Sequence, residues 1–341
     1  MIVKQSRLLF IDSEINTVGQ RGKCRVLIPN HPFSVVGSEK MRLTLLSFDM
    51  RRQWYNVNQT NNEFYLYSAS TNAYFPVVLQ PGVYRSFAAG AHTAGPKGLG
   101  HALQDALDIA VTAMNATLTS TIAVQSVTFD ENKRSFTFTL SGGGIPADLQ
   151  AVCFQCKQGL QPAGVSDAGF FSDVHEIIGG IPTRDSSVVQ AALDKDGNAF
   201  SSSMPASLNS LEAIYLRCNV QTSNYQTHGF EKGMPDRNGM AETSIFARIP
   251  LTRACFDDVF EFVQFEDAND LFQIHLHQKT LDSLIFEVTD DKGRLLAEVD
   301  PRQADLGLMN FKCVLRWDAL GPDEHFAREA VGSYNHLPLI K

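Results

Sequence analysis

The chain has 341 residues, of which 44% are hydrophobic and 19% are charged. This balance excludes an intrinsically disordered chain and can supply a large core, in one elaborated domain or in two. The formal net charge of -8 at pH 7 argues against a general nucleic-acid binder. The start lacks the apolar core of a signal peptide, and no run approaches the roughly 18 apolar residues of a membrane span, so a soluble protein made inside the cell is expected.

Charge is distributed unevenly along the chain. Residues 1–57 carry nine Lys or Arg against four Asp or Glu, whereas residues 256–300 carry twelve Asp or Glu against three Lys or Arg. A basic face toward packaged nucleic acid is one interpretation, because Lys and Arg neutralise backbone phosphates. Solvated faces of strands are the other interpretation, and direct contact with nucleic acid is left open.

The six cysteines are mostly isolated within apolar runs. We predict free, buried thiols, because an unpaired cysteine behaves as a small hydrophobic side chain. Cys153 and Cys156 have the spacing of half a zinc site, but no second pair follows at a metal-ligand spacing. The six positions are Cys24, Cys153, Cys156, Cys218, Cys255 and Cys313.

The beginning of the chain is typical of an antiparallel β domain. Short apolar or alternating runs predict strands at residues 8–12, 24–29, 41–50 and 64–67. Two prolines within residues 29–32 end the second strand, because proline cannot donate a ladder hydrogen bond.

The middle of the chain changes character. A helix is predicted from about residue 99 to 114, because apolar residues recur there at spacings of three and four while Asp105 and Asp108 face outward. Residues 122–129 and 135–140 predict a hairpin that packs against this helix. Residues 71–145 are therefore expected to form an α+β (strand-helix-hairpin) insertion. Residues 146–210, with few periodic elements, are expected to form a long, loop-rich connection.

The last part of the chain predicts successive antiparallel strands, at residues 212–220, 244–250, 271–277, 284–288 and 311–317. In the fourth of these, Leu284, Phe286 and Val288 fall on one face, which predicts one buried side. Residues 291–293 then predict a three-residue hairpin turn. Gly293 should take the left-handed conformation, which glycine adopts without a Cβ clash.

Eight of the predicted strands are expected to form one sandwich, near residues 25, 45, 65, 215, 247, 274, 286 and 314. Eight strands joined by long connections predict a mainly β fold, an eight-stranded antiparallel jelly-roll sandwich built from residues 1–70 and 211–318. Residues 319–341 are expected to form a C-terminal tail. Because no internal repeat is visible, one jelly roll with an insertion is preferred to two in tandem.

Motifs of enzyme chemistry are not found in the sequence: it has neither a phosphate-binding P-loop nor a nucleophile elbow. His275 and His277 share one strand face, as the ligands of metal-binding cupins do, and cupins are also jelly rolls. A cupin site needs a glutamate soon after the second histidine, and Glu287 is too distant. We therefore predict no catalytic, cofactor-binding or metal-ligating residue, with a cupin-like metal enzyme as the less favoured alternative.

Taken in order, several short segments resemble the penton-type minor capsid proteins of polinton-like viruses, virophages and related large double-stranded DNA viruses. The resemblance extends from about residue 20 to 317, and its specificity lies in order and spacing. The segments are MRLTLLSF at 41–48, YNVN at 55–58, PGVY at 81–84, IIGG at 177–180, IYLRC at 214–218, ARIP at 247–250 and FEVTDDKGR at 286–294.

The resemblance implies a structural role without catalytic residues. The expected function is that of a minor capsid subunit of an icosahedral virion, assembled inside the host cell. The implied partners are other copies of the chain, as a pentamer, together with the major capsid protein and other minor capsid proteins. A receptor- or ligand-binding jelly-roll module of a virion surface is the alternative.

Overall fold

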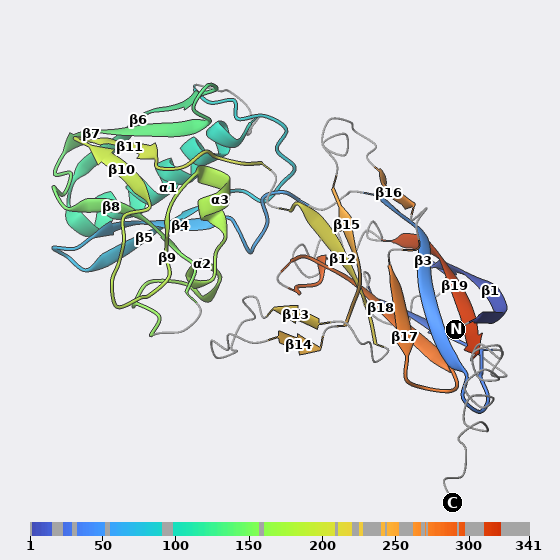
Figure 1. Ribbon diagram of the computed structural model, residues 1–341. Coiled ribbons are helices and arrows are strands. Elements are labelled where there is room, and N and C mark those ends of the chain that lie inside the picture. The colour runs from blue at the N-terminus through green and yellow to red at the C-terminus, as the bar shows by residue number, and fades with distance from the viewer. Residues whose placement is uncertain are drawn as a thin grey trace, which may run out of the picture. The chain divides into compact units, whose positions relative to one another are not determined.

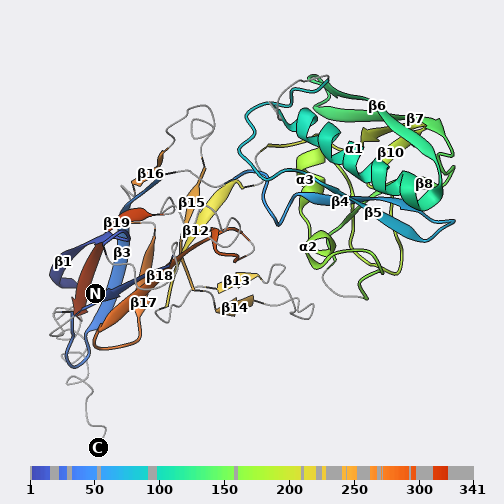
Figure 2. The same ribbon diagram turned by 180° about the vertical axis from the view of Figure 1, so that it is seen from behind.

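The computed structural model contains two folded units (Figures 1 and 2). Unit 1 is built from residues 1–53, 212–229 and 237–341, and unit 2 is built mainly from residues 54–211. The residues that the structure describes are 2–15, 23–28, 33–51, 55–90, 98–156, 160–208, 211–219, 225–227, 240–242, 244–251, 262–266, 270, 272–291, 293–296 and 310–321.

Sheet 1 of unit 1 is antiparallel and has the strand order β1-β19-β3-β16, with β17 also paired to β3. β16 pairs with residues 47–51 of β3 and β17 with residues 41–44, so these two short strands occupy successive parts of one position in the sheet. The strand bounds are Ile2–Asp12 (β1), Lys40–Arg51 (β3), Phe262–Glu266 (β16), Gln273–Leu276 (β17) and Phe311–Gly321 (β19).

Sheet 2 of unit 1 is also antiparallel and has the order β15-β12-β18-β2. Its strands are Lys23–Leu27 (β2), Ala213–Cys218 (β12), Ile245–Pro250 (β15) and Ser283–Thr289 (β18). A separate two-stranded ribbon joins Tyr225–Thr227 (β13) and Met240–Glu242 (β14).

The first three strands of unit 1 (β1, β2 and β3) alternate between the two sheets, and so do the last three (β17, β18 and β19). β17 and β19 belong to sheet 1, whereas β18 lies in sheet 2 between β2 and β12. The last strands of the chain are thus placed between early ones, as in a jelly roll. β18 pairs with β12 and β2 and not with its neighbours in sequence, β17 and β19, because alternation identifies a strand but not its partner.

The predicted strand near residue 65 is not part of this sandwich. It is β4 (Glu63–Ser68), which pairs with β5 (Ala73–Val78) and β8 (Leu149–Phe154) in unit 2. Its place in unit 1 is taken by β1, the early strand that the eight-strand prediction left out. The division of the chain accordingly lies near residue 53 and not near residue 70.

Both sheets of unit 1 bury one face in the sandwich core. Phe286 of β18 and Trp317 of β19 are fully buried, and Trp317 makes an edge-on contact with Phe33 at 5.4 Å between ring centroids. The predicted inward face of β18 is confirmed, because Leu284 and Val288 are buried as well. The alternation of apolar and polar residues in this strand follows from its one-sided burial.

The turn after β18 confirms the prediction for Gly293, whose φ is 79°. The N–H of Gly293 donates to the carbonyl of Asp290 at 3.2 Å, and the N–H of Asp290 donates to the carbonyl of Arg294 at 3.0 Å. Among the residues that the structure describes here, a bridge between Thr289 and Leu295 joins the two arms of the turn.

The cysteines confirm the prediction of buried thiols outside disulfides wherever the structure describes them. Cys24, Cys153, Cys156, Cys218 and Cys313 are all buried, and none of them forms a disulfide; Cys255 lies outside the described residues. Burial raises the pKa of Cys24 and of Cys156 to about 11, so both thiols are protonated at neutral pH.

Unit 2 contains two four-stranded sheets and the only long helix among the described residues. One sheet has the order β5-β4-β8-β9 and the other the order β10-β11-β7-β6. The remaining elements are α1 (Leu99–Leu118), β6 (Thr121–Asp130), β7 (Ser135–Gly143), α2 (Asp167–Phe170), α3 (Val174–Ile178), β9 (Pro182–Thr183), β10 (Leu193–Asp196) and β11 (Ala199–Ser202).

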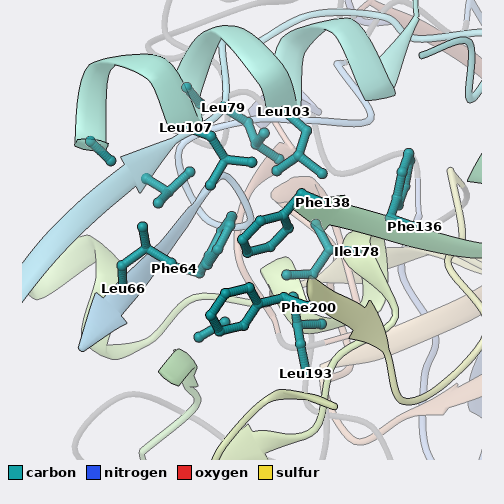
Figure 3. Close-up of a cluster of buried hydrophobic side chains, with 14 of the residues drawn as sticks. Phe64, Leu66, Leu79, Leu103, Leu107, Phe136, Phe138, Ile178, Leu193 and Phe200 are labelled. Carbon is teal, nitrogen blue, oxygen red and sulfur yellow. The ribbon is translucent and has the colours of Figure 1, made fainter. Parts of the chain in front are cut away.

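The helix and hairpin predicted for this unit are confirmed as α1, β6 and β7. α1 contacts β6 and β5, with Asp105 and Asp108 exposed as predicted. Its apolar face packs on a core that Figure 3 shows between the helix and the strands, where Phe138 and Phe200 stack at 4.8 Å. Gly100 is required at the helix start, because a Cβ there would collide with Ala88 and Ala89.

The prediction that residues 146–210 form a loop-rich connection was wrong. The described residues of this range contain six short elements, which are β8, α2, α3, β9, β10 and β11. The most buried is β8. Leu149, Ala151 and Cys153 join one hydrophobic cluster, while Val152 and Phe154 join another. Because both faces of β8 are buried, its sequence has no alternation that could have identified it.

A buried asparagine, Asn56, holds the beginning of unit 2 in place through its side-chain hydrogen bonds. The side chain of Asn56 donates to the carbonyls of Tyr84 at 2.7 Å and Leu208 at 3.1 Å, and it accepts from the N–H groups of Val57 and Tyr84. Residues near positions 56, 84 and 208 are thereby joined at one point. The early turn thus lies against the end of the unit.

Candidate assembly surface

The open edge of sheet 1 is β1, which pairs on one side with β19. No strand among the described residues pairs with its other side. The strand is 11 residues long, and its residues 2–8 are all exposed. The N–H and C=O groups of such an edge can pair with another chain, so natural proteins usually shorten or cover it.

Large apolar side chains are exposed along this strand. Phe10 is 71% exposed, Leu8 53%, Ile2 52% and Val3 45%. Phe10 pairs across the ladder with Val314, and Leu8 pairs with Arg316, which places both on the outer face of sheet 1. Several exposed apolar side chains on one edge strand mark an interaction surface more clearly than scattered ones do.

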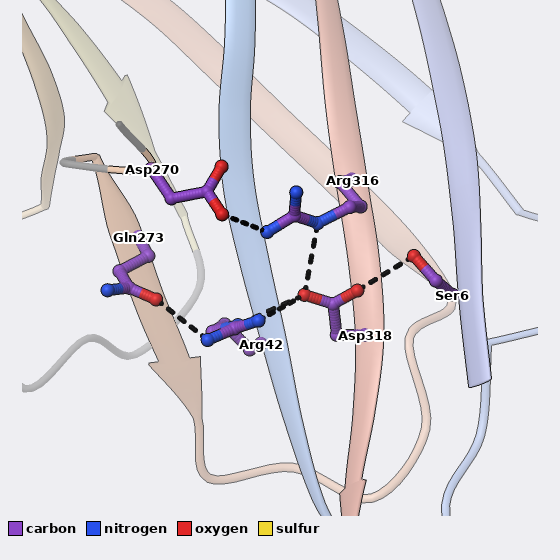
Figure 4. Close-up of polar contacts among 6 residues, drawn as sticks. All are labelled: Ser6, Arg42, Asp270, Gln273, Arg316 and Asp318. Atoms are coloured by element: carbon purple, nitrogen blue, oxygen red, sulfur yellow. Dashed lines mark hydrogen bonds and ion pairs between the residues drawn. The ribbon is translucent and has the colours of Figure 1, made fainter. Parts of the chain in front are cut away.

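A polar network covers the outer face next to this edge (Figure 4). One oxygen of Asp318 accepts from Arg42 at 2.6 and 3.0 Å and from Arg316 at 3.2 Å, and the other accepts from Ser6 at 2.8 Å. Arg316 also donates to Asp270 at 2.5 Å. The network joins β1, β19 and β3 through side chains in addition to the backbone ladder.

The charge of Asp318 is kept in the folded protein although its side chain is only 1% exposed. Burial alone would raise its pKa, but hydrogen bonds from Arg42 and Ser6 and the charges of Arg316 and Arg42 outweigh burial. The pKa of Asp318 is therefore below its ordinary value. The outer face is thus held by an ionised carboxylate between two guanidinium groups.

The edge carries a charge on its inward side as well. Arg7 of β1 lies opposite Trp317, a core-facing residue of β19, yet Arg7 is exposed. A charged residue at an inward position is typical of edge strands, where it limits uncontrolled pairing. Arg7 is the residue in the sequence that indicates an edge strand. It was not recognised, because the predicted eight-stranded sandwich did not include the strand at residues 8–12.

The two histidines of the cupin alternative lie beside this face. His275 of β17 pairs with Arg42 of β3, and His277 follows the end of β17. Burial and the charges of Arg42 and Lys40 lower the pKa of His275. In the described parts of the chain, no group of three His, Cys, Asp or Glu side chains is placed to hold a metal ion.

Chemically, the surface offers hydrogen-bonding backbone, exposed apolar side chains and fixed charges. These are the components of a protein–protein interface. Within the described residues, no helix is both long and apolar enough to cross a bilayer.

The solved structures that resemble this chain include the following two. One is the mavirus penton protein, with a TM-score of 0.43 and 8% sequence identity, covering 93% of this chain and 100% of that one. The other is a chain of the Sputnik virophage, with a TM-score of 0.38 and 11% identity, covering 93% of this chain and 98% of that one. No family model and no curated protein matches the chain.

Proposed function

We propose that the chain is a structural subunit of a viral capsid, of the minor, penton type, and that it has no enzymatic activity. The order of the sequence segments described above supports this, and so does the alternation of strands between two sheets. With β16 and β17 counted as one interrupted strand, the described residues contribute eight strands to the two sheets, and this number supports a jelly roll. The protein then belongs to the virion and is assembled inside the host cell.

The observation that carries the proposal is the open β1 edge beside a rigid outer face. A soluble monomer gains nothing from exposing Phe10 and Leu8 on an edge strand, because such strands promote aggregation. A subunit that is covered by its neighbour in an assembly avoids this cost. The Asp318 network then keeps the surface in one shape before assembly, which lowers the ordering cost of association.

The position of β1 also favours a ring. β1 lies at one side of sheet 1, whereas β16 and β17 lie at the other. An interface that joins two different surfaces of the same chain is heterologous, and it repeats until the rotation closes. Five copies around a vertex are the closed form that a penton-type subunit requires, next to the major capsid protein and other minor capsid proteins.

Native mass spectrometry of the purified protein tests this assignment. We expect the parent chain to form rings of five copies and the double variant Leu8→Ser, Phe10→Ser to remain monomeric. Both side chains are exposed, so the thermal stability of the variant should match that of the parent within about 0.5 kcal/mol.

The matched control is Ile109→Ser. Ile109 is exposed like Leu8 and Phe10, at 72%, but it belongs to α1 of unit 2 and not to β1. This variant should assemble like the parent. A parent chain that stays monomeric at all concentrations and is absent from particles would contradict the capsid role. Rings that survive the Leu8/Phe10 change would contradict only the choice of surface.

A further inference from the structure

A surface pocket of about 380 Å³ lies where β17 runs into the turn that follows it. Residues 275–279 line one side, and Glu39 and Lys40, at the beginning of β3, line the other. The volume is within the range of about 300–1,000 Å³ that small-molecule sites occupy. All lining residues belong to unit 1.

Nitrogen donors dominate the lining of this pocket. The ammonium group of Lys279 donates to the main-chain carbonyls of Gly37, at 3.0 Å, and Glu39, which fixes it in the wall. An ammonium group has three N–H donors, and imidazole and amide side chains add further ones. The donor side chains of the lining are those of Lys40, His275, His277, Gln278 and Lys279.

The one acidic residue of the lining is already engaged. One carboxylate oxygen of Glu39 accepts the N–H of Val36 at 3.2 Å, and the other lies 3.8 Å from the Nζ of Lys4. Glu39 is therefore occupied by a cation and a donor outside the pocket. The charges of Lys4, Lys40 and Lys279 together exceed the single negative charge of Glu39.

Arg42 adds to the positive charge beside the pocket, because it pairs with His275 across the β17–β3 ladder. Burial and the charges of Arg42 and Lys40 lower the pKa of His275. A bound anion would offset this positive charge and make protonation of His275 easier.

We propose that the pocket binds a phosphate-class oxyanion, either free phosphate or a phosphate group of a nucleic-acid backbone. A tetrahedral phosphate presents acceptor oxygens in several directions, which suits a pocket whose donor side chains come both from β3 and from β17 with the turn after it. A carboxylate presents two oxygens in one plane and suits a guanidinium fork instead. Lysine binds phosphate as a point charge, as Lys40 can here. This site does not depend on the capsid role.

Side-chain NMR of the histidines in the full-length protein tests the site, with inorganic phosphate titrated at neutral pH and low salt. We expect saturable shifts of His275 and His277 and none of His101 or His175, which lie in unit 2. Lys40→Gln should weaken the apparent affinity about tenfold, the effect of losing one charge-assisted hydrogen bond.

Lys133→Gln is the matched control, because Lys133 is exposed at the hairpin turn of unit 2. It should bind phosphate like the parent, and His277→Gln should bind more weakly, as a second test of the same pocket. Competition by a single-stranded oligodeoxynucleotide would assign the site to nucleic-acid phosphates, and binding without competition would assign it to free phosphate. Unsaturable shifts, equal shifts with acetate, or equal losses in Lys40→Gln and Lys133→Gln would overturn the proposal.

Discussion

Asp318 is the residue on which the outer face of sheet 1 depends. Its carboxylate accepts hydrogen bonds from Arg42, Arg316 and Ser6 while being almost fully buried. A buried charge without partners would be strongly destabilising, and a charge with several donors is not. The side chains of Arg42 and Arg316 are partly exposed, whereas that of Asp318 is buried. The network is therefore stronger than an ion pair at the surface, and its charges are not all removed from water.

Asp318→Asn should lower the free energy of unfolding at pH 7 by about 2 kcal/mol, because hydrogen bonds to a charged group contribute about 1.5–3 kcal/mol. A carboxyl with a lowered folded-state pKa stabilises the fold above its ordinary value of 3.8, and this contribution is lost as the pH falls through the lowered pKa. The difference between variant and parent should therefore shrink below about pH 4. Urea unfolding from pH 2 to 7 measures this.

The control for this change is Asp194→Asn, at an exposed position of β10 in unit 2. It should change stability by less than about 0.5 kcal/mol at any pH in that range. A loss in Asp318→Asn that stays constant down to pH 2 would mean that the charge of Asp318 does not matter.

Gly293 is the second position where one residue decides local structure. Its φ of 79° is in the left-handed region, where a β-branched side chain is strained. Gly293→Val should cost more than about 1 kcal/mol, as residues forced into sparsely populated backbone regions do. Gly293→Asn is the control and should cost less, because asparagine tolerates this region. Thermal unfolding compares the two, and equal losses would contradict the backbone explanation.

At the scale of elements, Asn56 connects three separate segments of unit 2 through four hydrogen bonds. The insertion leaves the jelly roll after β3 and returns before β12. Both ends of the insertion must lie close together in the folded unit. Without contacts between them, ordering the two ends would cost conformational entropy. Buried side-chain amides that bond backbone groups supply this connection.

Asn56→Ala should lower the stability of unit 2 by about 2–4 kcal/mol, because the buried N–H and carbonyl of Tyr84 and the partly buried carbonyl of Leu208 lose this partner. Amide hydrogen exchange at residue 84 should become faster in the variant, and less so at residue 57, whose N–H also donates to the carbonyl of Gly82 at 3.2 Å. Asn132→Ala, at an exposed turn, serves as control and should leave both measures unchanged. Unchanged protection in Asn56→Ala would mean that water replaces the amide without cost.

At the scale of the whole molecule, two units with separate cores should unfold separately. The sandwich core contains Phe286, and the core of unit 2 contains Phe138, and both side chains are fully buried. A chain with two cores need not unfold in a single cooperative transition. Each unit should thus have its own stability.

Calorimetry of paired variants measures this independence. Phe286→Ala and Phe138→Ala should each cost about 3–5 kcal/mol through lost burial and a residual cavity. We expect each variant to lower the temperature of a different transition. A single transition lowered equally by both would show that the two units unfold as one.

The sequence alone determined those features that depend on local patterns. β18 and the hairpin β6–β7 alternate because one face of each is buried, so their sequences reveal them. The helix α1 is identified by its stripe, and Gly293 by the conformation that only a few residue types adopt easily. The burial of the described cysteines follows from their apolar surroundings in the sequence.

Only the tertiary structure decided which strands pair and which surfaces stay open. β4 and β1 each have a strand-like sequence, but long-range pairing with β8 or with β19 determines the unit to which each belongs. β8 is buried on both faces and therefore has no period. The β1 edge and the pocket beside Lys40 unite residues more than 200 positions apart, and no local pattern records such a distance.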